Sequence, residues 1–136
     1  MIEQNKETAK RWLLEFWNGD LSLAHQLHAQ NYVRHDSPFP IENPDAYVKF
    51  ITIFRTAVPD LTFTLQDMVA DGNTVVLRWT VKGTHNGPLY GVQGTGKTVN
   101  CRGTDWLKFK DGKIVESWGF FDALGLMQQI GAIPDK

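Results

Sequence analysis

Cysteine, net charge and long apolar runs are three things that this 136-residue chain has little of. Its single cysteine, Cys101, allows no internal disulfide, so we expect a reduced, cytoplasmic protein. No apolar run approaches the roughly 20 residues that a membrane-spanning helix needs. The polar first residues, MIEQNKETAKRW, predict a helix rather than a signal peptide. We therefore expect no association with a membrane.

The charge is also nearly balanced, with 14 Lys and Arg against 15 Asp and Glu and a net charge of −1. The cations are spread evenly among the anions. Binding to a phosphate backbone needs a concentrated basic surface. The sequence therefore predicts no nucleic-acid partner.

Aromatic residues, by contrast, are abundant. They make up 12% of the chain, with five Trp and eight Phe, and 42% of all residues are hydrophobic. This composition excludes intrinsic disorder. A chain of this length buries roughly two thirds of the surface that its unfolded state exposes, which supports one core. We therefore expect a single domain over residues 1–136.

The first half of the chain reads as helical. Apolar residues at three- and four-residue spacing predict a helix over 9–17 that ends before Gly19. A short helix over 20–28 and a third helix over 43–58, closed by Pro59, follow. Three helices thus precede any long strand.

The second half alternates between apolar and polar residues, which is typical of strands with one buried face. This pattern predicts four antiparallel strands, over 61–66, 75–82, 99–109 and 114–121, and a last short helix over 123–130. The fold class is therefore α+β, with the helices on one face of a curved antiparallel sheet. Such a cone of helix and sheet leaves an apolar pocket at its open end.

Residues 91–98, GVQGTGKT, match the phosphate-binding pattern G-x-x-x-x-G-K-[ST]. In that motif the lysine and the hydroxyl residue open a helix, and the backbone N–H groups of that helix hold the phosphates. Here Thr98 opens a strand pattern, and residues 85–90 predict a loop. We therefore reject nucleotide binding.

Asp105 is the most informative single residue. Its strand parity is that of the apolar residues Val99, Cys101, Leu107 and Phe109. A carboxyl group buried on that face has a raised pKa, which suits a general acid or base at neutral pH. Two structural alternatives are an ion pair with Arg78 or Arg102, and a bulge at Gly103 that turns the side chain outward.

Asp122 is the second candidate, where the last strand passes into the last helix. Asp is a preferred helix N-cap, and a cap alone would explain the residue. Trp118 and Phe120 share its strand parity, however, and would surround it with a dry aromatic wall. Desolvation would then raise its pKa, as a catalytic base requires.

The histidines carry weaker signals. His35 lies beside Asp36 at a strand end, where the aspartate has the alternative role of capping a turn. His85 lies in the glycine-rich loop and is either at a pocket mouth or solvated. His25 and His28 are three residues apart but have no obvious third ligand, so we expect no metal. A nucleophilic serine or cysteine is not supported either, since no G-x-S-x-G occurs and Cys101 faces the core.

Six segments together resemble a known family. They are 16–20 (FWNGD), 32–36 (YVRHD), 57–61 (AVPDL), 76–87 (VLRWTVKGTHNG), 111–118 (DGKIVESW) and 122–131 (DALGLMQQIG). In order and spacing they are similar to the SnoaL-like polyketide cyclases, or ester cyclases, of the NTF2-like superfamily. The resemblance implies an NTF2-like (cystatin-like) cone with a deep apolar pocket, a homodimer or tetramer, and activity without a cofactor.

The resemblance also implies a reaction, the closure of a polyketide ring by intramolecular aldol addition with an acidic residue as general acid/base. By motif, Asp122 is the residue that carries over. Those cyclases are expected to place a histidine on the strand before the last hairpin, and CRGTDWLKF has none. Either Asp105 substitutes for it or the chemistry differs, because a shared fold does not fix a function.

The sequence thus predicts a general acid/base enzyme that acts on a small, largely apolar carbonyl compound. The expected catalytic residues are Asp122, Asp105 and His35. The expected substrate-binding residues are Trp118, Phe120, His85, Arg78 and Trp17. Two alternatives stay open, an epoxide-hydrolase- or isomerase-like enzyme on the same scaffold and a non-catalytic small-molecule binding protein.

A partner is predicted from Trp106, whose strand parity is that of Thr104 and Lys108 and places it on the outer face of the sheet. An exposed Trp on a broad sheet is typical of an interface. We therefore expect a homodimer through this face.

Overall fold

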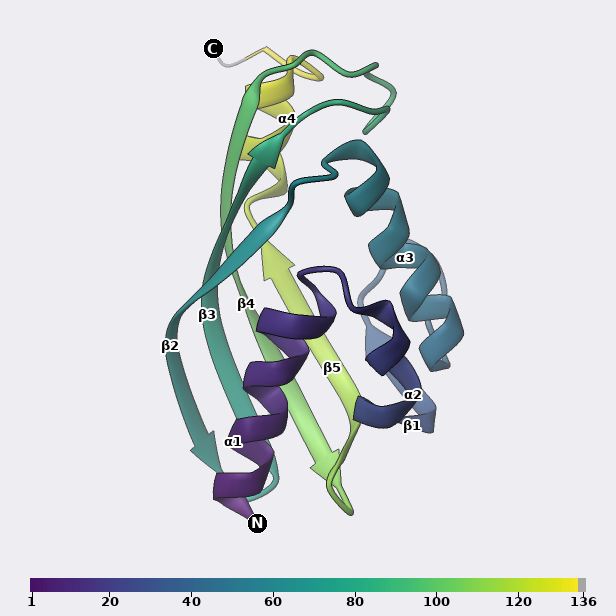
Figure 1. Ribbon diagram of the computed structural model, residues 1–136, viewed down its shortest axis with the longest axis vertical. Coiled ribbons are helices and arrows are strands. Elements are labelled where there is room, and N and C mark those ends of the chain that lie inside the picture. Colours follow the sequence, from purple (N-terminus) through teal and green to yellow (C-terminus); the bar gives the residue numbers. More distant parts are fainter. Residues whose placement is uncertain (135–136) are drawn as a thin grey trace.

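A long, curved sheet of five strands forms one side of the molecule, and helices cover its inner face (Figure 1). This computed structural model describes residues 1–134. The helical segments are α1 (Ile2–Arg11), a π-helical turn (Trp12–Phe16), a 3₁₀ turn (Leu21–Leu23), α2 (Ala24–Leu27), α3 (Pro44–Ala57) and α4 (Ala123–Ile130). The strands are β1 (His28–His35), β2 (Thr62–Asp71), β3 (Thr74–Thr84), β4 (Thr98–Lys110) and β5 (Lys113–Phe121).

The helix boundaries follow from local chemistry. Pro44 occupies the first turn of α3, and the Asn43 side chain accepts a hydrogen bond from the backbone N–H of Ala46. At the other end of the chain, Asp122 caps α4, and Gly131 ends that helix with a φ of 82°. The predicted helices over 43–58 and 123–130 are therefore confirmed.

The sheet has the strand order β1-β5-β4-β3-β2. Strands β2 to β5 pair antiparallel, as the alternating pattern predicts. The prediction of an all-antiparallel sheet is wrong, however, because β1 adds a fifth strand that pairs parallel to β5. The burial of its residues does not alternate, and its register with β5 shifts between His28 and Val33. Thr98 begins β4 rather than a helix, so the phosphate-binding pattern lacks the structure that it requires.

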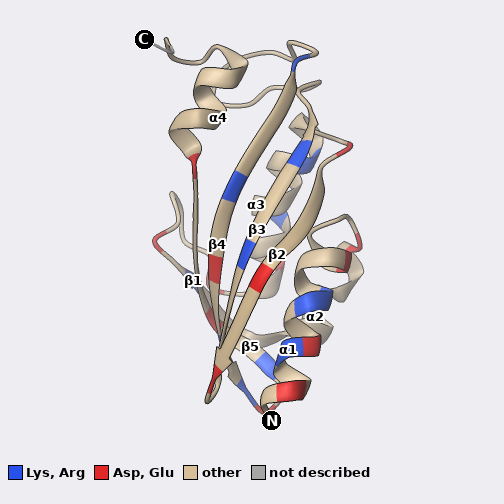
Figure 2. Cartoon of the chain, turned by 90° about the vertical axis from the view of Figure 1, so that its left-hand side faces the viewer, with Lys and Arg blue, Asp and Glu red and all other residues tan. Residues whose placement is uncertain are grey.

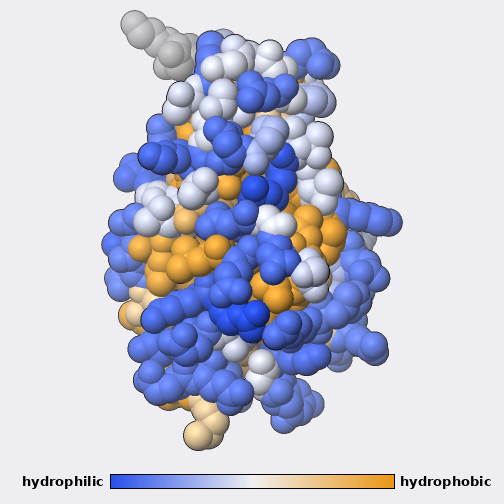
Figure 3. Space-filling view, in the orientation of Figure 1, coloured by the Kyte–Doolittle hydropathy of each residue, from blue (hydrophilic) through white to orange (hydrophobic). Residues whose placement is uncertain are grey.

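The core lies between the helices and the inner face of the sheet. Trp12 and Phe16 of the π-helical turn, and Trp17 directly after it, belong to this core together with sheet residues that include Trp79 and Leu107. The outer surface on the helix side is mostly hydrophilic, with apolar groups visible near its middle (Figure 3). Among the helices of residues 1–134, none has the length and apolar character that crossing a membrane requires.

Candidate active site

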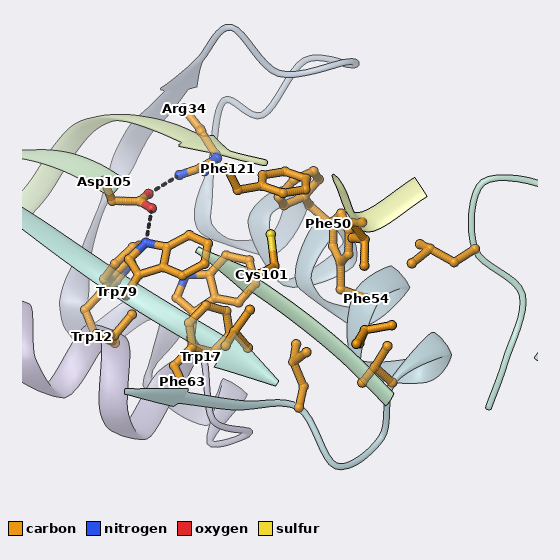
Figure 4. Close-up of a pocket in the computed structure, with 17 residues that line it drawn as sticks. Trp12, Trp17, Arg34, Phe50, Phe54, Phe63, Trp79, Cys101, Asp105 and Phe121 are labelled. Carbon is orange, nitrogen blue, oxygen red and sulfur yellow. Dashed lines mark hydrogen bonds and ion pairs between the residues drawn. The ribbon is translucent and has the colours of Figure 1, made fainter. Parts of the chain in front are cut away.

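A pocket lies between α3, the π-helical turn Trp12–Phe16 and the inner face of the sheet (Figure 4). The cavity itself has a volume of about 70 Å³. The whole space between its walls, including the open mouth, is about 680 Å³. Apolar side chains dominate the lining, which is Trp12, Leu13, Trp17, Arg34, Phe50, Phe54, Val58, Leu61, Phe63, Trp79, Val81, Leu89, Val99, Cys101, Asp105, Phe121 and Leu126. A largely apolar pocket with a few polar groups is typical of a small-molecule site.

Two charged residues meet in this lining. Arg34 Nη1 donates to Asp105 Oδ2 over 3.0 Å, and Trp79 Nε1 donates to Asp105 Oδ1 over 2.9 Å (Figure 4). The side chains of Arg34 and Asp105 are only 9% and 3% exposed. Among the described pocket residues, Asp105 carries the one carboxyl group. The strand parity of Asp105 is therefore confirmed, and its carboxyl group lies at the pocket.

Both residues of this pair have a raised pKa, for different reasons. Burial raises the pKa of the Asp105 carboxyl, against the opposing effects of the Arg34 guanidinium and the Trp79 N–H. Burial lowers the pKa of Arg34, but the neighbouring Tyr47 and Asp105 raise it by more. The pKa of Arg34 is therefore raised overall, and the guanidinium keeps its charge. A raised pKa makes the Asp105 carboxylate a stronger base than an ordinary aspartate, which suits proton transfer.

A hydrogen-bonded cluster holds the guanidinium from behind. Arg34 Nη1 also donates to Tyr47 Oη and to Ser117 Oγ, both over 3.3 Å. Tyr47 Oη accepts a second hydrogen bond from Trp17 Nε1 over 2.9 Å, and Ser117 shares a hydrogen bond with Tyr32 Oη. Burial raises the pKa of Tyr32 to about 12 and that of Tyr47 well above its ordinary value, so both hydroxyls stay protonated.

Two glycines make room for these side chains. A Cβ at Gly119 would collide with Arg34 Nη2 and lie 2.6 Å from Asp105 Oδ2. A Cβ at Gly103 would lie 2.6 Å from the Trp79 ring. Gly119 pairs with Asp105 across β4 and β5, and Gly103 pairs with Trp79 across β3 and β4. The absence of side chains at these two positions opens the inner face of the sheet where the ion pair lies.

The position of Asp122 corrects the prediction that it lies in a dry aromatic environment. Its side chain is exposed and accepts the N–H of Gly125 over 2.9 Å, as an N-cap does. Phe120 is 58% exposed, and Trp118 stacks on His35 with ring centroids 4.7 Å apart. Both aromatic residues line a groove on the outer face of the sheet, away from the pocket, so they cannot desolvate Asp122.

Three other predicted site residues also lie outside the pocket. His35 Nε2 lies 2.9 Å from Glu116 Oε1 on the outer side of β1. Arg78 is exposed on β3 and pairs with neither candidate carboxylate. His85 is fully buried, where its Nδ1 lies 3.0 Å from Thr95 Oγ1 and fixes the loop before β4. Of the five predicted binding residues, Trp17 alone lines the pocket.

The ion-pair partner of Asp105 is Arg34, and not Arg78 or Arg102, the two partners that the structural alternative named. Arg34 lies in the segment YVRH on β1, and that strand has no alternating pattern. The one usable signal was its parity with Tyr32, a residue that is buried with it on the inner face of β1.

Cys101 lines the pocket, and burial raises the pKa of its thiol, so it is not a reactive thiolate. Within residues 1–134, no three His, Cys, Asp or Glu side chains gather as a metal site would require.

The sequence matches the SnoaL-like polyketide cyclase family over residues 7–130, and the chain therefore belongs to that family. Comparison with the curated proteins finds no match. A candidate SnoaL-like polyketide cyclase from Jannaschia sp. CCS1 superposes with a TM-score of 0.89 at 24% identity, covering 98% of this chain and 95% of the other. The expected α+β cone of the NTF2-like type is thus confirmed.

Two proteins from Streptomyces are also similar. AclR from Streptomyces galilaeus, a candidate hydroxylase, is 30% identical with a TM-score of 0.89, and the match covers 100% of this chain and 86% of AclR. IdmH from Streptomyces antibioticus, a candidate polyketide cyclase, is 29% identical with a TM-score of 0.81, and the match covers 94% of this chain and 99% of IdmH. These matches support a cyclase-type function as the coarse assignment.

Proposed function

We propose that the chain is a cofactor-independent general acid/base enzyme that acts on a small, largely apolar carbonyl compound, with Asp105 as the base. The observation that carries the proposal is the carboxyl group of Asp105 in a pocket whose other walls are mainly aromatic and aliphatic. Family membership supports ring closure by an intramolecular aldol addition. Asp122, the residue expected from the motif, is exposed on the outside of this pocket and is not assigned this role.

The reaction then follows from the pocket. The Asp105 carboxylate removes a proton from a carbon next to a carbonyl group, which leaves an enolate. The enolate carbon forms a bond to a second carbonyl carbon of the same molecule, whose oxygen becomes an alkoxide. The Asp105 carboxyl group returns its proton to that alkoxide, so the catalyst is restored. The aromatic walls fold the substrate so that the two reacting carbons lie close together.

Proton abstraction can be tested without the natural substrate. The probe is 2-tetralone, an aromatic ketone with activated C1 protons, and the readout is exchange of those protons in D₂O followed by NMR. General-base catalysis contributes roughly 10²–10⁴-fold, so Asp105→Asn should slow enzyme-dependent exchange at least about 100-fold. Asp122→Asn is the matched control and should change it less than about twofold. Exchange that is equal in wild type and Asp105→Asn would remove the proposal.

A second candidate function is binding without catalysis. It is favoured by the two hydrogen bonds that already occupy both oxygens of Asp105. In that case 2-tetralone or a related ketone would bind to the wild-type protein with no exchange above the buffer rate. The same experiment therefore separates the two functions.

We also propose that the chain forms a homodimer through the outer face of the sheet. Trp106, Trp118 and Phe120 meet there, with Trp106 opposite Trp118 and Thr104 opposite Phe120 in the β4–β5 register. Trp106 is 49% exposed. Charged residues are widely spaced along β2, β3 and β4 (Figure 2). An exposed aromatic patch suits a self-associating surface.

A further inference from the structure

The guanidinium of Arg34 is bound at only one of its nitrogens. All three of its hydrogen bonds, to Asp105, Tyr47 and Ser117, leave from Nη1. Nε and Nη2 donate to no described residue, although the side chain is only 9% exposed and lines the pocket. Asp105 therefore contacts the guanidinium end-on, and the Nε/Nη2 edge keeps its donors free.

That edge has the geometry that a planar oxyanion prefers. Two parallel N–H groups on one side of a guanidinium match the two oxygens of a carboxylate in a fork, and such charge-assisted pairs are strong. The plane is held in place by the rings of Tyr47 and Phe50, which lie 5.3 and 5.7 Å from Arg34 Cζ. Gly119 lies beside Nη2 and has no side chain to cover it.

The surroundings of Arg34 also contain more hydrogen-bond donors than acceptors. Tyr47 Oη accepts two hydrogen bonds, and its own proton has no acceptor in the described chain. Ser117 accepts from Arg34 and shares one hydrogen bond with Tyr32, which leaves one of the two hydroxyl protons unused. Buried donors without acceptors are unfavourable and call for an explanation. Tyr47 and Ser117 do not line the pocket, so a pocket ligand would meet the free Nε/Nη2 edge of Arg34 rather than these hydroxyl protons.

We propose that the Nε/Nη2 edge of Arg34 is a binding subsite for a planar oxyanion, either a carboxylate or an ionised 1,3-dicarbonyl, on an otherwise apolar ligand. This inference rests on the proposed function only in taking the same pocket as the ligand site. The body of the ligand lies against the aromatic walls formed by Trp17, Phe50, Phe54 and Phe63. The Arg34–Asp105 pair is neutral as a whole, but the free edge of Arg34 selects a ligand with one negative charge.

The test measures binding by isothermal titration calorimetry with matched probes. 2-Naphthoate represents the carboxylate, 2-naphthamide is its uncharged counterpart of nearly equal shape, and ionised 1,3-indanedione represents the enolate. The wild-type protein should bind at least one of the two anions at least about tenfold more tightly than 2-naphthamide. Comparison of the two anions identifies which source of the oxyanion the site prefers. If neither anion is preferred over the amide, the proposal is wrong.

The variants assign the preference to Arg34. Arg34→Gln alone leaves the buried Asp105 without its cation, so Arg34→Gln is combined with Asp105→Asn to keep the site neutral and similar in volume. The double variant should lose the tenfold preference and keep its affinity for 2-naphthamide within about twofold. Arg34→Lys keeps the charge but lacks the fork, and it should retain only part of the preference. Arg78→Gln, which removes one positive charge from the exposed outer face, should change nothing.

Asp105→Asn separates this inference from the proposed function. It removes a negative charge beside the subsite, so the affinity for the preferred anion should stay the same or rise. If this variant keeps the anion preference while 2-tetralone exchange is unaffected, the base assignment fails and the subsite stands. If the preference is absent in the wild type or unchanged in the double variant, the subsite fails, whatever the exchange rates show.

Discussion

Arg34 and Asp105 lie on strands that do not pair with each other, and their side chains meet over Gly119 of the strand between them. The sheet order places β5 between β1 and β4, and the ion pair spans it with a distance of 3.0 Å. Gly119 is the residue of β5 opposite Asp105. The site therefore depends on a residue that contributes no side chain.

Gly119→Ala should disrupt this arrangement. The new Cβ would collide with Arg34 Nη2, and overpacking of a buried site costs about 1–3 kcal/mol. We expect a loss of that size in the free energy of unfolding measured with urea, together with a loss of anion preference. The cost should shrink in an Arg34→Met background, where the colliding group is gone. Equal costs in both backgrounds would show that the two residues do not interact.

Removing one partner of the ion pair should destabilise the fold more than removing both. Asp105→Ala leaves a buried guanidinium without its carboxylate, and breaking such a pair costs about 3–5 kcal/mol. The combination of Asp105→Leu with Arg34→Met replaces both charges by apolar groups and should be close to neutral. Chemical denaturation of the three proteins at one pH measures the difference. A double variant as unstable as Asp105→Ala would contradict this prediction.

Asp122→Ala should affect stability through the helix cap alone. The side chain accepts the N–H of Gly125, and loss of such a cap costs about 1 kcal/mol. Asn43→Ala, which removes the equivalent bond to Ala46 at the start of α3, is the matched control and should cost a similar amount. Asp122→Ser can still cap and should recover most of the stability. Thermal unfolding compares the four proteins, and a loss well above that of Asn43→Ala would indicate a further role.

His28 should make the fold less stable in acid. Burial lowers the pKa of His28 to about 4, and its Nδ1 lies 2.9 Å from the carbonyl oxygen of Ala24. The unfolded chain takes up a proton near pH 6.5 while the folded chain does not, so stability falls as the pH drops between these values. From pH 7 to pH 5 this histidine should remove about 2 kcal/mol of stability.

The measurement is urea denaturation of the wild type and His28→Phe at both pH values. The variant keeps an aromatic ring among Phe16, Tyr32 and Tyr47 but has no group that titrates. The loss between pH 7 and pH 5 should therefore be smaller in His28→Phe by about 2 kcal/mol. The contribution of Asp105 is common to both proteins and cancels in this comparison.

Trp106→Glu should prevent the proposed dimer. A carboxylate in place of the Trp106 ring removes the largest apolar contact of the outer groove and would be desolvated on association, which is unfavourable. Light scattering at micromolar concentration should give the mass of two chains for the wild type and of one chain for the variant. Val69→Glu is the control, because Val69 is exposed on β2 and does not line the groove. A wild-type protein that is monomeric would remove the proposal.

Much of the fold could be predicted from the sequence because local patterns determine it. Period-two alternation placed Asp105 on the inner face and Trp106 on the outer face, since neighbouring residues of a strand point to opposite sides. The same rule failed at Asp122, which lies one residue beyond β5, where the chain turns to begin α4. Parity has no meaning for Asp122 outside the strand, whereas Trp118 and Phe120 lie within β5 and line the groove on its outer face.

The partner of Asp105 could not be predicted because it depends on tertiary structure. Arg34 is 71 residues away, on a strand whose register with β5 shifts and whose burial pattern does not alternate. Nothing local distinguishes it from Arg78 or Arg102, which are closer in sequence and lie on strands with a clear pattern. The strand order, with β1 beside β5, is the information that brings Arg34 to the pocket.

The parallel pairing of β1 with β5 has a consequence for how the molecule folds. β1 is among the first elements of the chain, whereas β5 is the last strand, so their pairing closes a loop of most of the chain. Contacts between residues so far apart in sequence form late and slowly. During synthesis, Arg34 therefore has no ion pair with Asp105 until both β4 and β5 have been synthesised. Any shortened chain that lacks β5 should keep parts of the helical layer and have no site.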